Sequence, residues 1–74
     1  MNPPNQKYIV EARDDKGNLI FDCEQPPAEW ISGVTIDQMY QYFFCNHPHA
    51  ESTTWKELIE WFNSKSWYVR PKTW

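Results

Sequence analysis

Aromatic side chains dominate the apolar content of this short chain and limit what it can fold into. Its 74 residues include five Trp, four Tyr and four Phe, but only two Leu. A chain of this length buries only a little over half of the surface that it exposes when unfolded, so it needs a dense core, a covalent staple or a partner. Each aromatic ring can bury roughly 150–250 Å², and about six of them packed together could form that core. We therefore predict one small domain whose core is built from rings.

The N-terminal leader and the lack of long apolar stretches bear on where the protein resides. Met1 to Asn5 contain neither a basic region nor an apolar one, so no signal peptide is expected. Pro3 and Pro4 suit neither a helix interior nor a central strand, which predicts a flexible leader over 1–6 and one domain over 7–74. No stretch reaches the roughly 18 apolar residues of a membrane span, so we expect no membrane partner and a cytoplasmic location.

Two alternating segments separated by a turn predict a β-hairpin over residues 7–13 and 18–24. Gly17 in the connecting segment 14–17 can supply the positive φ that a four-residue loop needs. Pairing Arg13 with Asn18 would place one apolar set on a single face: Tyr8, Val10, Ala12, Leu19, Phe21 and Cys23. A slip of one residue would bring Glu11 and Asp22 into that face, so the first register is the one expected.

Two helices with capping boxes are expected after the hairpin. Thr35 with Gln38 starts the first, which ends near Cys45, and Thr54 with Glu57 starts the second. Their apolar faces comprise Ile36, Met39, Tyr40, Phe43 and Phe44 in the first helix, and Trp55, Leu58, Ile59 and Phe62 in the second.

The remaining segments complete the predicted fold. One helical turn within 28–33 should carry Trp30 and Ile31 back over the sheet. Residues 67–70 are short, aromatic and β-branched, which favours a third strand on the hairpin edge, closed by Pro71. The fold class is therefore α+β in the order β-β-α-α-β, with two helices packed on one face of a three-stranded antiparallel sheet.

The cysteines and histidines are the candidate residues for a metal site or a catalytic site. Zinc could be held by Cys45, His47 and His49 with Cys23 as a fourth ligand, but structural zinc sites present two closely spaced ligand pairs. Cys45 with His47 lacks a third group to orient the base, and the two glycines stand too far apart for a phosphate loop. We expect two free thiols, no metal, no cofactor and no enzymatic activity.

Leftover aromatic and acidic residues predict a protein partner instead. Tyr42 and Trp61 fall off the apolar faces of the helices, so these two rings should be exposed. Trp74, the last residue, and Trp30 could each either be exposed for binding or cap an open end of the core. The first thirty residues are acidic, and the expected contact with a basic surface involves Asp14, Asp15, Asp22 and Glu24. By analogy of size and composition, the chain suits a phage- or mobile-element-encoded inhibitor of a host protein.

Two alternatives stay open beside this one. The helices could form a helix-turn-helix, or Trp67, Tyr68 and Trp74 could stack single-stranded bases beside Arg70 and Lys72. Against a nucleic-acid role stand the acidic hairpin, the net charge of −3 and an inter-helix loop too long for the motif. A sheet with an open edge could also pair with a second copy, which would make a homodimer.

Overall fold

The fold is an antiparallel sheet backed by two helices, in agreement with the predicted α+β class. The structure is a computed structural model that describes residues 6–72, so all but Gln6 of the expected leader lies outside the described residues. In chain order the elements are β1 (Lys7–Ala12), the 3-10 turn η1 (Ala28–Trp30), β2 (Val34–Thr35), α1 (Ile36–Asn46), α2 (Trp55–Ser64) and β3 (Trp67–Pro71). The strands lie in the order β2-β1-β3, all antiparallel.

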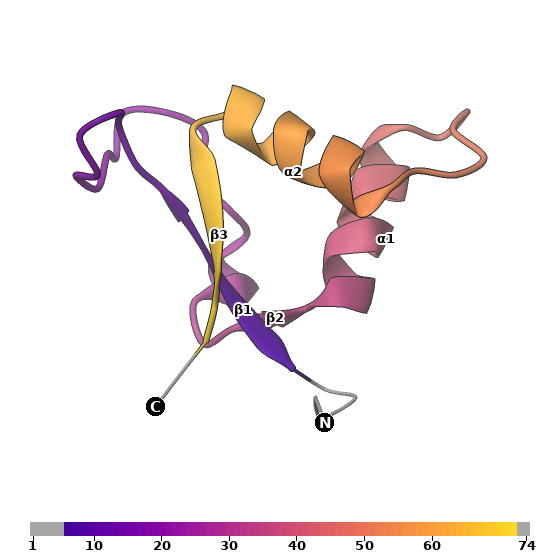
Figure 1. Cartoon of the computed structure of the whole chain (residues 1–74), viewed down its shortest axis with the longest axis horizontal. Helices are drawn as coiled ribbons and strands as arrows, with labels where there is room; N and C mark the ends of the chain where they lie inside the picture. The colour runs from indigo at the N-terminus through magenta and orange to yellow at the C-terminus, as the bar shows by residue number, and fades with distance from the viewer. Residues whose placement is uncertain (1–5, 73–74) are drawn as a thin grey trace.

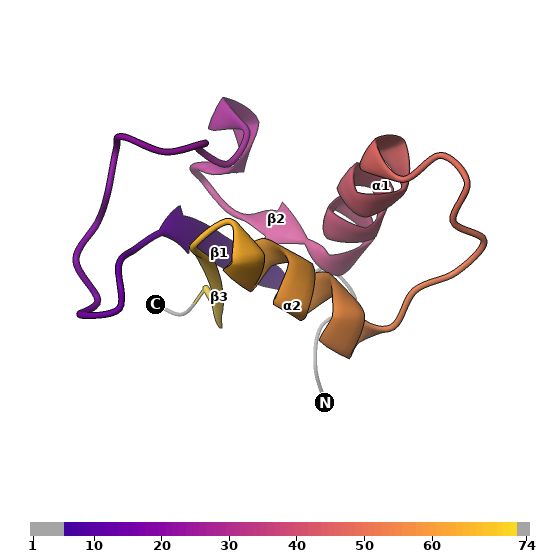
Figure 2. The same cartoon turned by 90° about the horizontal axis from the view of Figure 1, so that it is seen from above.

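The long loop between β1 and η1 lies at one end of the molecule, and α1 with the loop that follows it lies at the opposite end (Figures 1 and 2). α1 continues directly from β2, and α2 leads into β3 through a tight turn at Ser66, which has a positive φ of 66°. The segment between β1 and η1 extends away from α1 (Figure 2). Neither α1 nor α2 of the described chain is long enough to cross a membrane.

The pairing of β1 with β3 separates an inner and an outer face. Val10 pairs with Val69 and Ala12 with Trp67 on the face that meets the helices, while Glu11 pairs with Tyr68 on the other face. Tyr8 pairs with Pro71, whose missing N–H falls on the outward side of this edge strand. The third strand is confirmed at the predicted place, and β1 is the central strand.

The predicted second strand over 18–24 is wrong, and so is its expected register, because the turn after β1 is shorter than expected and the chain leaves β1 after Ile20. Gly17 donates to the carbonyl oxygen of Asp14 at 3.0 Å, and Asp14 donates to that of Asn18 at 2.9 Å. With Gly17 at φ 87°, the loop holds three residues instead of four. Arg13 therefore lies opposite Leu19 rather than Asn18. This one-residue shift turns Ile20 toward the core and leaves Leu19 and Phe21 outside.

Val34 and Thr35 take the place of the expected second strand. They pair with Tyr8 and Lys7, and the Val34 side chain is completely buried. The chain after Ile20 leaves the ladder because the side-chain amide of Gln25 donates to the carbonyl oxygens of Ile20 and Cys23, at 3.0 and 3.2 Å. Those acceptors are satisfied without a strand partner.

Both helices begin at the predicted caps. The Thr35 hydroxyl accepts from the N–H of Gln38 while the Gln38 side chain accepts from the N–H of Thr35, which is a complete capping box. At α2 the Thr54 hydroxyl accepts from the N–H of Glu57, and the Glu57 carboxylate accepts from that hydroxyl instead of from the backbone. The fully buried core comprises Val10, Ala12, Trp30, Val34, Met39, Phe43, Leu58, Phe62 and Trp67.

The turn at η1 divides its two apolar residues. Trp30 is buried against Tyr42, Phe62 and Trp67, with ring centroids 5.1–6.4 Å apart. Ile31, which was also expected to pack on the sheet, is 89% exposed. A 3-10 turn of only three residues can bring one side chain to the core but not its neighbour.

Candidate functional site

Tyr42 and Trp61 belong to the aromatic packing and are less exposed than predicted. Tyr42 lies 5.1 Å from Trp30 and 5.9 Å from Trp67, between ring centroids, and Trp61 lies 5.3 Å from Phe43. Both rings are partly buried against the core. Burial raises the pKa of the Tyr42 hydroxyl, and the nearby Glu24 carboxylate adds to this effect. Trp74, the third expected aromatic, lies outside the described residues.

The expected acidic contacts divide between structural and exposed roles. The Asp14 carboxylate accepts from the N–H groups of Lys16 and Asn18, both at 2.9 Å, and these bonds lower its pKa. Asp14 therefore builds the turn, while Asp15 and Asp22 are exposed. Glu24 pairs with the Lys65 ammonium at 3.1 Å.

The cysteines and histidines are not gathered into one place among the described residues. The Nδ1 of His47 lies 2.9 Å from the carbonyl oxygen of Phe43, and its ring stacks on the Phe43 ring at 4.2 Å. Cys45 is exposed and Cys23 is partly buried, and both thiols are free, as the sequence predicts. His47 thus closes the end of α1 and covers the core.

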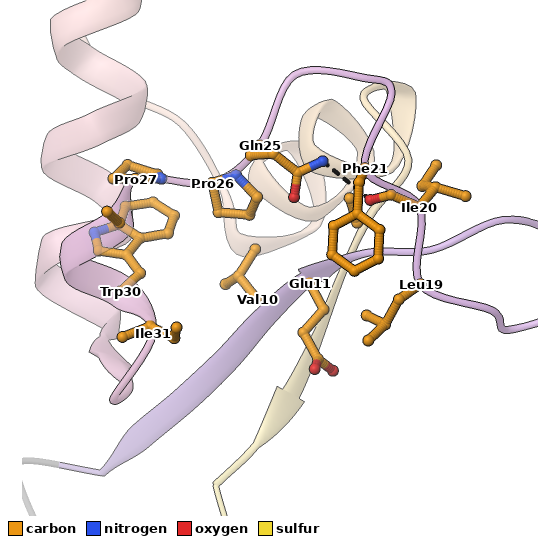
Figure 3. A pocket seen from close by; sticks show the side chains of 12 residues that line it. Val10, Glu11, Leu19, Ile20, Phe21, Gln25, Pro26, Pro27, Trp30 and Ile31 are labelled. Atoms are coloured by element: carbon orange, nitrogen blue, oxygen red, sulfur yellow. Dashed lines mark hydrogen bonds between the residues drawn. The ribbon is translucent and has the colours of Figure 1, made fainter.

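An apolar groove beside β1 is the feature that best suits a functional site. Figure 3 shows Pro26, Pro27, Trp30 and Ile31 on one side, Leu19, Ile20 and Phe21 on the other, and Val10 and Glu11 of β1 between them. Its volume is about 240 Å³. Phe21 is 77% exposed, Leu19 46% and Ile31 89%. Large apolar side chains exposed together on a small protein mark an interaction site.

The groove walls are fixed to the rest of the domain. The indole N–H of Trp67 donates to the carbonyl oxygen of Glu24 at 2.8 Å, across 43 residues of sequence. Gln25 holds the carbonyl oxygens of Ile20 and Cys23 on the other side, and Trp30 anchors the end of the segment in the core. The segment that carries these apolar side chains is thus attached to the domain through Glu24 and Trp30.

The polar groups of the groove do not form a catalytic arrangement. Among its lining residues the ionisable one is Glu11, whose carboxylate lies 3.0 Å from the guanidinium of Arg13 and 3.4 Å from that of Arg70. Among the described residues that line the groove there is no Ser, Cys, His or Lys, and most of the lining side chains are apolar.

The sequence held one signal for this groove that the hairpin prediction did not use. Three consecutive residues are apolar: Leu19, Ile20 and Phe21. Because side chains alternate between the two faces of a strand, either Ile20 or both Leu19 and Phe21 must face outward. In the structure Leu19 and Phe21 are the residues that face outward.

Comparisons with protein-family models, with curated proteins and with solved structures returned no significant match to this chain.

Proposed function

We propose that this chain is a non-enzymatic protein-binding module and that the groove beside β1 is its binding site. The observation that carries the proposal is the exposure of Leu19, Phe21 and Ile31 around one apolar cavity. The exposed part of these side chains gains nothing for folding while it faces water, and a partner that covers one of them completely would gain at most about 1.5–3 kcal/mol. The ordered groove walls reduce the entropy that binding would otherwise lose.

The acidic contact in this proposal comes from the segment that forms the groove. Between Lys16 and Lys56 the chain has no Lys or Arg, and this stretch contains Asp22, Glu24 and Glu29. A basic surface on the partner would be attracted to it. We extend the proposal to inhibition of a host protein in the cytoplasm by a phage- or mobile-element-encoded chain, by analogy with its small size and acidic composition.

A random-peptide display selection tests the proposal. Selected peptides should bind the wild-type chain and lose roughly tenfold to a hundredfold in affinity when Phe21→Ser or Ile31→Ser is introduced, because each change removes one covered apolar side chain. Ile36→Ser is the matched control, since Ile36 is an exposed apolar residue at the start of α1, outside the groove. Equal losses for all three variants, or no selected peptide, would contradict the proposal.

A second candidate function is favoured by the sheet face that bears no helix. Tyr68 is 43% exposed on this face, and the cations on or just beyond β1 and β3 are Lys7, Arg13, Arg70 and Lys72, against the acidic Glu11, Asp14 and Asp15. An exposed ring among cations can stack a base of single-stranded nucleic acid. Binding of a labelled oligothymidylate at low ionic strength, lost on Tyr68→Ala and on adding salt, would support this function.

A further inference from the structure

The groove is bounded by an edge of β1 that is open at one residue. Lys7 accepts from the N–H of Lys72 and Arg13 donates to the carbonyl oxygen of Ser66, both at 2.9 Å, so these residues face β3. Along a strand in an antiparallel sheet, the backbone N–H and C=O groups of successive residues point alternately to one edge of the strand and to the other. Ile9 and Glu11 therefore also face β3, while the backbone groups of Val10 point toward the groove.

Along the edge of β1 that faces the groove, the residues two positions before and after Val10 are both paired. Tyr8 is opposite Val34 of β2, and the carbonyl oxygen of Ala12 accepts from the N–H of Ile20 at 3.1 Å. Within residues 6–72, neither the N–H nor the C=O of Val10 has a hydrogen-bond partner in the protein. Val10 is only 6% exposed and lines the groove. Unpaired backbone groups on so covered a residue are uncommon.

We infer that an extended segment of a partner protein adds to β1 at Val10 as a short strand. This inference rests on the proposed function and specifies how the groove is used. One residue of the segment would donate its N–H to the Val10 carbonyl oxygen and accept from the Val10 N–H. Such strand addition is a common way of recognising peptides, in which the backbone provides affinity and side-chain pockets provide specificity.

The length and composition of the added segment follow from the groove. The four steps from Tyr8 to Ala12 span roughly 13 Å at about 3.3 Å per residue, which leaves space for about three residues between β2 and the Ile20 end. The side chain of the residue opposite Val10 would point inward, on the same face as the Val10 side chain. It would therefore contact Pro26 and Trp30, so it should be apolar. Flanking apolar residues would cover Phe21 and Ile31.

The charge around the groove favours a basic partner over a second copy of this chain. Asp22 and Glu29 are exposed, and neither forms an ion pair within the described part of the chain. Lys or Arg residues beside the apolar centre of the segment would pair with them. Two copies meeting through this face would instead bring their acidic rims together, at a net charge of −3 each.

N-methylation of the selected peptides tests strand addition directly. Peptides obtained by display selection are synthesised with a methyl group on one backbone nitrogen at a time, and affinities are measured by calorimetry. Methylation of the nitrogen opposite Val10 should weaken binding at least about tenfold, because it removes a hydrogen bond and leaves the Val10 carbonyl oxygen unpaired. Methylation at either adjacent residue, whose N–H points away from β1, is the matched control and should change affinity little.

The outcomes separate this inference from the proposed function. A peptide that loses affinity on Phe21→Ser but tolerates methylation at every position would leave the binding module in place and overturn strand addition. Binding that is indifferent to both Phe21→Ser and methylation would overturn both. A wild-type chain that dimerises in a sizing experiment, and becomes monomeric on Phe21→Ser, would show that a second copy occupies the groove and would overturn the basic partner segment.

Discussion

Replacing Trp67 is the change that most clearly separates the core from the exposed groove. Trp67 is completely buried, and its ring centroid lies 5.4 Å from that of Phe62. Its indole N–H also donates to the Glu24 carbonyl oxygen at 2.8 Å, so it connects β3 with the groove segment. Trp67→Phe keeps an aromatic ring but removes this donor, whereas Trp67→Ala removes the ring as well.

The expected losses can be worked from these contacts. An acceptor left unpaired costs about 1–3 kcal/mol, which is the loss expected for Trp67→Phe. Truncating a buried Trp to Ala costs about 3–5 kcal/mol. At about 0.05–0.15 kcal/mol per residue, a domain of this length is stable by about 4–11 kcal/mol in total. Trp67→Ala should therefore remove between about a quarter and all of the stability.

Urea unfolding followed by circular dichroism measures both effects and their control. With a slope of about 1 kcal/mol per molar urea, Trp67→Phe should lower the unfolding midpoint by about 1–3 M. Phe21→Ala is the control, because Phe21 is equally aromatic but mostly exposed, and it should shift the midpoint by less than about 0.5 M. A Phe21→Ala shift as large as that of Trp67→Phe would refute the assignment of these residues to groove and core.

Three further predictions concern the turn, the first cap and Tyr42. Gly17→Ala should cost about 1–2 kcal/mol in the free energy of unfolding, because φ is 87° and an added Cβ would meet no atom within 4 Å, so the backbone alone is strained; Gly17→Asn, measured by the same urea method, should cost less. Thr35→Ala should cost about 1 kcal/mol by losing the helix cap, while Ser52→Ala in the exposed inter-helix loop should leave the melting temperature unchanged. Because the folded pKa of Tyr42 is raised, its contribution to stability is fully present below the ordinary pKa of 10.0 and is lost as pH rises through the folded value. A stability–pH profile should therefore fall more steeply above that pH in the wild type than in Tyr42→Phe, and identical profiles would contradict the burial of this hydroxyl.

Local signals predicted the two helices and the strands β1 and β3 correctly. The caps at Thr35 and Thr54 depend on hydrogen bonds between residues three positions apart, so the sequence contains the whole interaction. β3 was found because Pro71 and the β-branched Val69 restrict that segment to an edge strand. Each of these elements is determined by residues that are close in sequence.

The groove was not predicted, because it depends on one turn and on distant contacts. The hydrogen bonds of Asp14 with Gly17 and Asn18 give the loop three residues instead of four. This change in loop length exchanges the faces on which Leu19 and Ile20 lie. The end of the strand is set by Gln25, and the path of the segment by the bond from Trp67 to Glu24.

The predicted exposure of Tyr42 and Trp61 was wrong for a related reason. Helical periodicity places Tyr42 on the far side of α1 from Tyr40 and Phe44 of the predicted apolar face, but η1 brings Trp30 against that side of the helix. A second buried face is thus created by a segment outside the helix. Spacing within α1 and α2 cannot show it, and the same holds for Trp61, which packs on Phe43 of the other helix.

Amide hydrogen exchange at Val10 in the free protein tests the central claim, that the edge of β1 is open to the groove. Ile9 and Glu11 face β3 and should be protected by their ladder hydrogen bonds, while the Val10 N–H points to the groove without a partner among residues 6–72. Val10 should therefore exchange far faster than its two neighbours and become protected when a selected peptide binds. Protection of Val10 equal to that of Ile9 and Glu11 in the free protein would contradict it.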